Sequence, residues 1–308
     1  MGEVVLPTRT VPELLRRGLF IADKPQGPTS HQVSAWVHDL VGAEKAGHAG
    51  TLDPRVTGVL PIAFNEATRA LDAMLVGDKE YVGVLELHQD VPDEKLRAML
   101  RRFVGPIYQT PPVRSAVKRE MRVRTIHELD LLERNGRLVL FRTRCESGTY
   151  IRTLANDVGE ALGVGGHLAD LRRTRTGTFT EANAHPLTDL HDALVFLREN
   201  GDEMAIRRLV HPMERLLEHL PRIVVKDTAA DAICHGANLH VPGVSSMDAR
   251  IRKGELVALL TAKGEGVALG TAMLTASQVD SMRQGVAADT KRVLMDPGTY
   301  PKGWKSPS

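Results

Sequence analysis

One carboxylate in this chain stands in an unusual setting. Asp53 lies in the segment 47–58, which reads GHAGTLDPRVTG, and Pro54 follows it directly. Glycine and proline disfavour helices and central strands, and a proline holds the residue before it in extended geometry. Apolar segments flank the loop at 34–41 and 59–63. A single acid on a bent loop between buried elements suits a positioned catalytic nucleophile. The same residues also fit an ordinary turn.

Two further side chains could take part in the same chemistry. Tyr81 opens the alternating segment 78–87, which predicts a strand with one apolar face. Arg152 lies in the run CESGTYIRTL (145–154), directly after a strand predicted over 138–144. From spacing alone, Tyr81 also fits a core or edge aromatic, and Arg152 fits a routine ion-pair partner.

The elements that must position these residues are short helices and alternating strands. Residues 18–30 read as a strand that runs into a turn, and Ser30 is expected to cap a helix over 32–41. Residues 105–112 contain three prolines and predict a rigid connector. Further helices are expected over 66–75, 93–103, 187–200 and 203–210, and one follows Arg152 as far as Gly163.

Charge is balanced over the whole chain but not along it. The 308 residues carry a formal net charge of +2, so any nucleic-acid-binding surface must be local. One basic run spans 114–124 and predicts a phosphate-binding surface, in which Arg114 and Lys118 are candidates. Another lies at 171–177. A charge run is also typical of a solvated face.

Composition excludes several classes of protein. Aromatic residues make up 4% of the chain, which disfavours a broad base-stacking platform. Cys145 and Cys234 lie far apart, so we expect neither a zinc pattern nor a disulfide framework, and a reducing compartment is indicated. The histidines show no metal-binding spacing, and no phosphate loop or membrane-spanning run is present. We therefore expect a soluble cytoplasmic protein without metal or cofactor.

The chain changes character at Pro221. Short β-rich segments separated by glycines follow at 223–225, 256–260 and 267–273. They predict a small β-barrel of about eighty residues, a size suited to an independent module.

The segment GHAGTLDPRVTGVL (47–60) resembles the catalytic loop of the TruB/dyskerin family of RNA pseudouridine synthases. The run DKPQGPTS (23–30) is similar to that family's first motif, the K-x-Y pattern at 79–81 to its second, and GTYIR (148–152) to its third. The runs ICHGANLHVPGV (233–244) and VALGTAML (267–274) resemble a PUA domain, an RNA-binding module. Together these matches cover nearly the whole chain.

The resemblance implies a role for each candidate. Asp53 is the nucleophile, Tyr81 stacks on the target base and serves as general base, and Arg152 pairs with Asp53. A guanidinium there keeps the carboxylate ionised and fixes its direction. The resemblance further implies substrate contacts for His48, Tyr150, Leu154, Arg172 and Arg173, and structural support from Lys24 and Pro25.

The fold implied by the resemblance is α+β. A catalytic domain with a mainly antiparallel mixed sheet and helices is followed by the small PUA β-barrel. We expect an N-terminal arm over 1–17 that packs on the C-terminal domain, a catalytic domain over 18–215, a PUA domain over 220–296 and a tail over 297–308.

Members of this family differ in how they choose a uridine. Stand-alone bacterial enzymes recognise the T-loop of tRNA, whereas the archaeal and eukaryotic type works in a box H/ACA ribonucleoprotein. The run PPVRSAVKREMRVRTIHELDLLE (111–133) resembles the second type. The long lysine-rich tail of the eukaryotic members is missing, which favours an archaeal member. The implied partners are a guide RNA with the H/ACA box, substrate rRNA or tRNA, two small core proteins and a kink-turn-binding ribosomal-type protein. A guide-independent tRNA enzyme and a non-catalytic RNA-assembly scaffold remain as alternatives.

Overall fold

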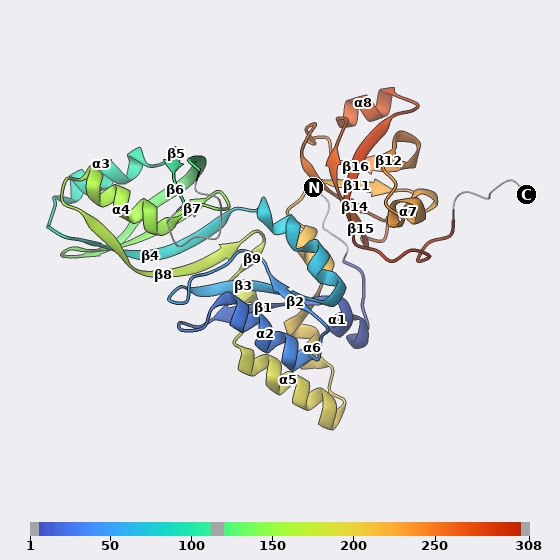
Figure 1. Cartoon of the computed structure of the whole chain (residues 1–308), viewed down its shortest axis with the longest axis horizontal. Coiled ribbons are helices and arrows are strands. Elements are labelled where there is room, and N and C mark those ends of the chain that lie inside the picture. Colours follow the sequence, from blue (N-terminus) through green and yellow to red (C-terminus); the bar gives the residue numbers. More distant parts are fainter. Residues whose placement is uncertain (1–5, 112–119, 303–308) are drawn as a thin grey trace, which may run out of the picture.

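The computed structural model describes residues 6–111 and 120–302, which form two sheets with helices packed around them (Figure 1). The larger sheet runs in the order β10-β1-β3-β8-β4-β7-β6-β5, with β2 paired to β3 and β9 paired to β8. Its strands are β1 (Gly18–Lys24), β2 (Ala46–His48), β3 (Thr57–Phe64), β4 (Lys79–Leu87), β5 (Gly105–Gln109), β6 (Arg122–Asn135), β7 (Leu138–Cys145), β8 (Gly166–Thr176), β9 (Phe179–Thr180) and β10 (Val210–Pro212).

The helices of this part cover both ends of the larger sheet. They are α1 (Val11–Arg17), α2 (Ser30–Val41), the 3-10 helix η1 (Asn65–Leu75), α3 (Asp93–Arg102), α4 (Ile151–Ala161), the 3-10 turn η2 (Glu181–Asn183), α5 (Leu187–Asn200), α6 (Met204–Leu209) and the 3-10 helix η3 (Met213–Leu217). No helix among the described residues combines the length and the apolar character needed to cross a membrane.

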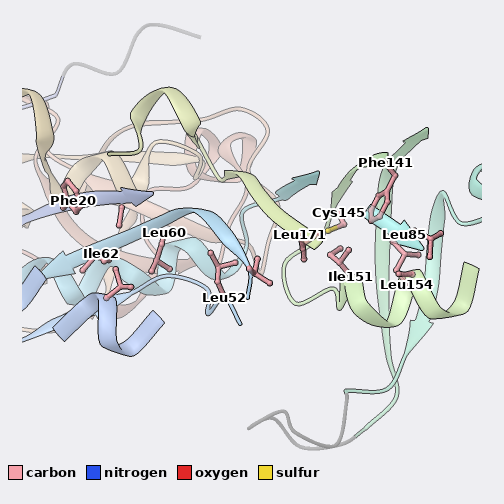
Figure 2. Packing of buried hydrophobic residues seen from close by; sticks show 14 of the residues in the cluster. Phe20, Leu52, Leu60, Ile62, Leu85, Phe141, Cys145, Ile151, Leu154 and Leu171 are labelled. Atoms are coloured by element: carbon pink, nitrogen blue, oxygen red, sulfur yellow. The ribbon is translucent and has the colours of Figure 1, made fainter. Parts of the chain in front are cut away.

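The larger sheet consists of two halves that meet between β3 and β8. One half contains β1, β3 and α2, and the other contains β4 to β8 with α3 and α4 (Figure 1). β3 and β8 are parallel and pair at only two positions, Thr57 with Arg172 and Gly58 with Arg173. A single apolar core nevertheless runs through both halves, from Phe20 and Leu60 to Leu85 and Phe141 (Figure 2).

The start of α2 differs from the sequence prediction by one residue. Thr29, not Ser30, is the N-cap: its hydroxyl accepts a hydrogen bond from the Gln32 amide, and the Gln32 side chain accepts one from the Thr29 amide. This reciprocal capping box leaves the Ser30 hydroxyl available for another partner. Ser30 is fully buried and turns toward the Asp53 loop instead.

The predicted connector over 105–112 is also corrected. Residues Gly105–Gln109 form β5, the outermost strand of the larger sheet, paired with β6. An edge strand tolerates Pro106 because one of its sides needs no ladder partner. The helix predicted over 66–75 is present as the 3-10 helix η1. The other predicted helices and strands lie within a few residues of their expected positions.

The smaller sheet runs in the order β12-β16-β15-β14-β11-β13 around a core of its own. Its elements are β11 (Arg222–Val225), α7 (Asp227–Cys234), β12 (Leu239–His240), the 3-10 turn η4 (Val241–Gly243), β13 (Val244–Met247), β14 (Leu256–Leu260), β15 (Gly266–Ala272), α8 (Ala276–Ser281) and β16 (Val286–Val293). The expected mixed α+β architecture with a small C-terminal β-domain is thereby confirmed.

The N-terminal helix α1 joins the two parts. Thr10 caps it, and the Arg17 guanidinium pairs with Asp296 at 2.5 Å, beyond the last strand of the smaller sheet. The Arg9 guanidinium pairs at 2.8 Å with Glu214, which is 3% exposed and also accepts a hydrogen bond from the Gly266 amide. A segment from the start of the chain therefore stabilises the junction of the two sheets.

Candidate active site

Asp53 and Arg152 form an ion pair at the surface of the larger sheet. Asp53 lies in the loop between β2 and β3, and the Val56 amide donates to its carbonyl at 3.0 Å. The Arg152 Nη2 group contacts the Asp53 carboxylate, and 55% of each side chain is exposed. These residues are 99 positions apart in the chain, and their pairing was expected from the resemblance. The carboxylate is therefore oriented by a cation and accessible to a large substrate.

The Asp53 loop is held from below by Lys24, the last residue of β1. This lysine is fully buried, and its ammonium donates to the carbonyls of Pro25 at 2.8 Å, Pro54 at 3.1 Å and Val56 at 2.9 Å. Burial lowers the pKa of Lys24 below its ordinary value. Three carbonyl acceptors suit the three donors of an ammonium group. The segment that directly follows Asp53 is thus attached to one buried cation, which also binds the carbonyl of Pro25.

The backbone two residues before Arg152 is held by a residue that the sequence did not single out. Tyr150 is the N-cap of α4, and its side chain makes no capping hydrogen bond. Gln109 of β5 supplies one, because its amide oxygen accepts from the Tyr150 backbone N–H at 2.9 Å and its amide nitrogen donates to the Tyr150 carbonyl at 3.1 Å. Gln109 is 3% exposed. Its only sequence signal was a position in a proline-rich run read as a connector.

Tyr81 lies on β4 beside Arg173 of β8, and it is half-buried. The Arg173 guanidinium lies close enough to influence the pKa of the Tyr81 phenol. Desolvation raises the pKa of Tyr81 above its ordinary value, and the nearby cation of Arg173 partly opposes that rise. At neutral pH the phenol is protonated and can donate as well as accept a hydrogen bond.

His48 ends β2, five residues before Asp53. Its Nδ1 lies 3.1 Å from the Ser34 hydroxyl, its Nε2 lies 3.3 Å from the Thr51 hydroxyl, and the His31 ring meets it edge-on at 4.8 Å. Burial lowers the pKa of His48 to about 4, with help from the charges of His31 and Arg173. The imidazole is therefore neutral near pH 7 and contributes no charge toward RNA phosphates.

The two arginines expected to contact RNA have different surroundings. Arg172 is partly exposed and forms a two-pronged pair with Asp23, at 2.9 and 3.0 Å, and a further contact with Glu181. Arg173 is 1% exposed and donates to backbone carbonyls inside the protein. Successive residues of a strand face opposite sides, so the two side chains point to different surroundings. The substrate contacts that the resemblance implies for Arg172 and Arg173 stay a prediction.

The remaining candidates are spread around the Asp53–Arg152 pair. Tyr150 is half-buried at the start of α4, Pro25 is exposed beside Lys24, and Leu154 is 1% exposed in the core beneath α4 (Figure 2). Arg114 and Lys118 lie outside the described residues. Within 6–111 and 120–302, no group of three or more histidine, cysteine or acidic side chains is arranged to hold a metal ion.

Three family models match this chain in succession. The TruB family pseudouridylate synthase (N terminal domain) model matches residues 38–151, the tRNA pseudouridylate synthase B C-terminal domain model matches 152–218, and the PUA domain model matches 221–294. Asp53 and Tyr81 fall within the first of these matches, and Arg152 falls within the second.

Curated relatives and solved structures agree with these models. The chain is 54% identical over 296 residues to the probable tRNA pseudouridine synthase B of Methanopyrus kandleri, covering 96% of this chain and 88% of that protein. It is 50% identical over 297 residues to the protein of that name from Methanocaldococcus jannaschii, with the same coverage of 96% and 88%.

Two solved structures are similar over almost their whole length. A Cbf5-Nop10-Gar1 complex contains a chain with a TM-score of 0.93 and 46% identity, covering 98% of this chain and 93% of that one. A structure of an H/ACA RNP bound to a substrate RNA containing 2′-deoxyuridine contains one with a TM-score of 0.89 and 43% identity, covering 99% and 94%. The chain therefore belongs to the TruB family of pseudouridine synthases, enzymes that isomerise uridine to pseudouridine in RNA, and it carries a PUA domain after the catalytic part.

Proposed function

We propose that this enzyme is the catalytic subunit of a box H/ACA ribonucleoprotein, in which a guide RNA selects the uridine. The likeness to the chain in the Cbf5-Nop10-Gar1 complex supports this, because it extends over 98% of the present chain at 46% identity. Its partners are then a guide RNA, the substrate RNA, two small core proteins of the Nop10 and Gar1 kind and a kink-turn-binding ribosomal-type protein. Residues 18–215 are the catalytic unit, and 220–296 bind the guide.

The observation that carries the catalytic proposal is the Asp53–Arg152 ion pair on a loop held from below by Lys24. Pseudouridine formation breaks the bond between C1′ and N1 of the uracil ring and forms a bond between C1′ and C5. The C5 proton is lost to a base, and N1 gains a proton from solvent, so the atoms balance. No oxidant, reductant or energy source is needed. Asp53 acts as the nucleophile, at C1′ or at ring carbon C6, or it stabilises the cation as the base leaves.

Arg152 orients the Asp53 carboxylate and keeps it ionised. Tyr81, on the strand across the sheet, lies against the uracil ring and serves as the general base: its phenol oxygen takes up the C5 proton as the phenol gives its own hydrogen to water. A base in a stacked helix cannot reach either group, so the target uridine must be unpaired or flipped. His48, neutral and beside the loop, meets the RNA and takes no part in the proton transfer.

A second candidate function is the guide-independent modification of the T-loop uridine of tRNA. The names of the curated relatives, probable tRNA pseudouridine synthase B, favour it. A purely structural role as an RNA-assembly scaffold is less favoured, because such a role would tolerate the loss of Asp53, Tyr81 and Arg152, and all three are present. Both cysteines are buried and unpaired, which suits a reducing cytoplasm.

The test uses two parallel assays of pseudouridine formation with the purified protein. One supplies an unmodified tRNA transcript alone, and the other supplies guide RNA, target RNA and the core proteins. Activity only in the second supports the guided function, whereas strong activity in the first supports the tRNA function. Asp53→Asn must abolish whichever activity is found. Normal turnover by that variant would overturn the nucleophile, and silence of the wild-type protein in both assays, with RNA still bound, would support the scaffold.

A further inference from the structure

Arg173 lies where the two halves of the larger sheet meet. Its backbone pairs with Gly58 of β3 on one side and with Tyr81 of β4 on the other. β4 and β8 pair along most of their length, but β3 and β8 pair at only two positions. Backbone hydrogen bonds are therefore few at the boundary between the half that carries Asp53 and the half that carries Tyr81.

The Arg173 side chain spans this boundary. Its Nε donates to the Val59 carbonyl of β3 at 2.8 Å, and its Nη2 donates to the Gly50 carbonyl of the Asp53 loop at 2.9 Å. Arg173 is also the direct cross-strand neighbour of Tyr81, and its charge acts on the Tyr81 phenol. One planar group thus contacts β3 and the Asp53 loop, and it belongs to the residue paired with Tyr81.

The Asp53 loop is shaped to admit this group. Gly50 has a φ of +72°, and a Cβ atom there would lie 3.1 Å from Arg173 Nη1. A side chain at position 50 would therefore press on the guanidinium in addition to straining the backbone. Gly50, which the sequence marks only as a turn residue, therefore also allows the Arg173 guanidinium to approach the loop closely.

Such a group is costly to bury. Arg173 is 1% exposed, and no carboxylate among the described residues lies within ion-pair distance of it. Lys79 of β4, 4% exposed, adds a second buried cation nearby. Apolar side chains could join two sheet halves without this cost. The charge and the directional donors of Arg173 thus point to a role beyond packing.

We propose that Arg173 is a positioning residue for pseudouridine formation, which sets the loop that carries Asp53 and the Tyr81 phenol at a fixed separation. The inference rests on the roles proposed above for Asp53 and Tyr81. Both groups must address one nucleotide, Asp53 from the side of the sugar or C6 and Tyr81 at the ring. A misplacement of about 1 Å can cost about 100-fold in rate.

The charge of Arg173 has a second consequence for the phenol. The groups that face Tyr81 include Arg173 of β8 and Cys145 of β7. The Arg173 cation holds the pKa of Tyr81 lower than desolvation alone would leave it. Removal of the cation should therefore raise that pKa further, which an absorbance titration of tyrosinate can detect. The chain has four tyrosines, and Tyr81→Phe identifies the relevant one.

The test measures single-turnover rates and RNA affinity for Arg173→Met and Arg173→Lys in whichever assembly is active. We expect Arg173→Met to lower the rate about 100-fold with RNA affinity within about threefold of wild type. The phenol should titrate at higher pH. Arg173→Lys keeps the cation but not the planar fork, so we expect the titration to return toward wild type while the rate stays about tenfold low.

Arg134→Met is the matched control. Arg134 also makes several contacts, since it pairs with Asp90 and Asp93 and donates to the Gly136 carbonyl at 2.8 Å. None of these partners belongs to the Asp53 loop or to β4 and β8. The Arg134→Met variant should have a lower free energy of unfolding than the wild type and an unchanged single-turnover rate. Combination of Arg173→Met with Tyr81→Phe should cost less than the product of the two single losses, because one residue acts through the other.

Three results would overturn the inference: a folded Arg173→Met at the wild-type rate, a loss confined to RNA affinity, or strictly multiplicative losses in the double variant. If Arg173→Met does not fold, a single-turnover rate of Arg173→Lys within twofold of wild type would overturn the inference instead. The proposed function is tested separately by Asp53→Asn in the same assay. If that variant is inactive while Arg173→Met is normal, only the positioning role falls.

Discussion

The buried hydroxyl of Ser30 exchanges two hydrogen bonds with the backbone of Leu52, the residue directly before Asp53. The hydroxyl accepts from the Leu52 amide at 2.8 Å and donates to the Leu52 carbonyl at 3.0 Å. Ser30 is fully buried, and Leu52 is 4% exposed. The first turn of α2 therefore fixes the backbone of the residue directly before Asp53, the proposed nucleophile.

Ser30→Ala should lower both stability and activity. Both polar groups of Leu52 would lose a partner in a dry interior, at a cost of about 2–4 kcal/mol in the free energy of unfolding. Urea unfolding measures this change, and single-turnover kinetics should show a fall of more than tenfold. Thr29→Ala is the control: it removes an exposed cap of the same helix at about 1 kcal/mol and leaves Leu52 paired. Equal effects of the two variants on the rate would contradict the bracing role of Ser30.

Arg152→Met should separate activity from stability. Because 55% of each side chain of the Asp53–Arg152 pair is exposed, the pair adds at most about 1 kcal/mol to folding. We expect an almost unchanged unfolding midpoint and a rate at least 100-fold lower, since the carboxylate loses its orienting cation. Arg142→Met breaks another exposed pair, with Asp130 at 2.9 Å, and should leave both quantities unchanged. A normal rate for Arg152→Met would rule out the orienting role.

Gly58→Ala should be far more damaging than Gly27→Ala. Both glycines have a left-handed backbone, with φ of +103° and +114°. A Cβ at Gly27 meets nothing within 4 Å, whereas one at Gly58 would lie 2.2 Å from the Arg173 carbonyl. We expect a loss of about 1 kcal/mol for Gly27→Ala from backbone strain, and at least about 3 kcal/mol for Gly58→Ala, where the β3–β8 contact must open. Chemical denaturation measures both, and similar losses would show that this contact is not tightly packed.

His48 should make the protein less stable as the pH falls. The pKa of His48 is lowered to about 4 in the folded protein, against about 6.5 in the unfolded chain. Between these values the unfolded chain binds a proton that the folded chain does not, so the free energy of unfolding decreases from about pH 6.5 to about pH 4.

His211, whose pKa burial also lowers to about 4, adds to the same trend. Between about pH 4 and pH 6.5, unfolding of His48→Gln should take up about one proton fewer than unfolding of the wild type. The part of the pH dependence that comes from His211 should remain. Urea unfolding at a series of pH values measures the slope. An identical slope in His48→Gln and wild type would contradict the neutral, buried imidazole.

The sequence by itself identified the residues whose local setting is unusual. Glycine and proline around Asp53 leave few backbone conformations, and alternation places Tyr81 at the start of a strand, but each pattern also fits a purely structural residue. The resemblance of their segments to the TruB/dyskerin motifs assigned the catalytic roles. The break at Pro221 separated the two sheets, since composition changes there from helical to β-rich. These signals depend only on neighbouring residues in the chain, so they can be recognised without knowledge of the tertiary structure.

The tertiary structure alone decided which side chains support the site. The sequence predicts Ser30 as the cap of a helix, but Thr29 is the N-cap in the structure. The Ser30 hydroxyl instead binds Leu52, which lies 22 residues away in the chain. Arg172 and Arg173 read as neighbouring surface cations, whereas the strand places them on opposite faces, and Arg173 reaches carbonyls 114 and 123 residues away. A buried hydrogen-bonding partner so distant leaves no trace in local pattern, because it depends on which strands pair and in which register.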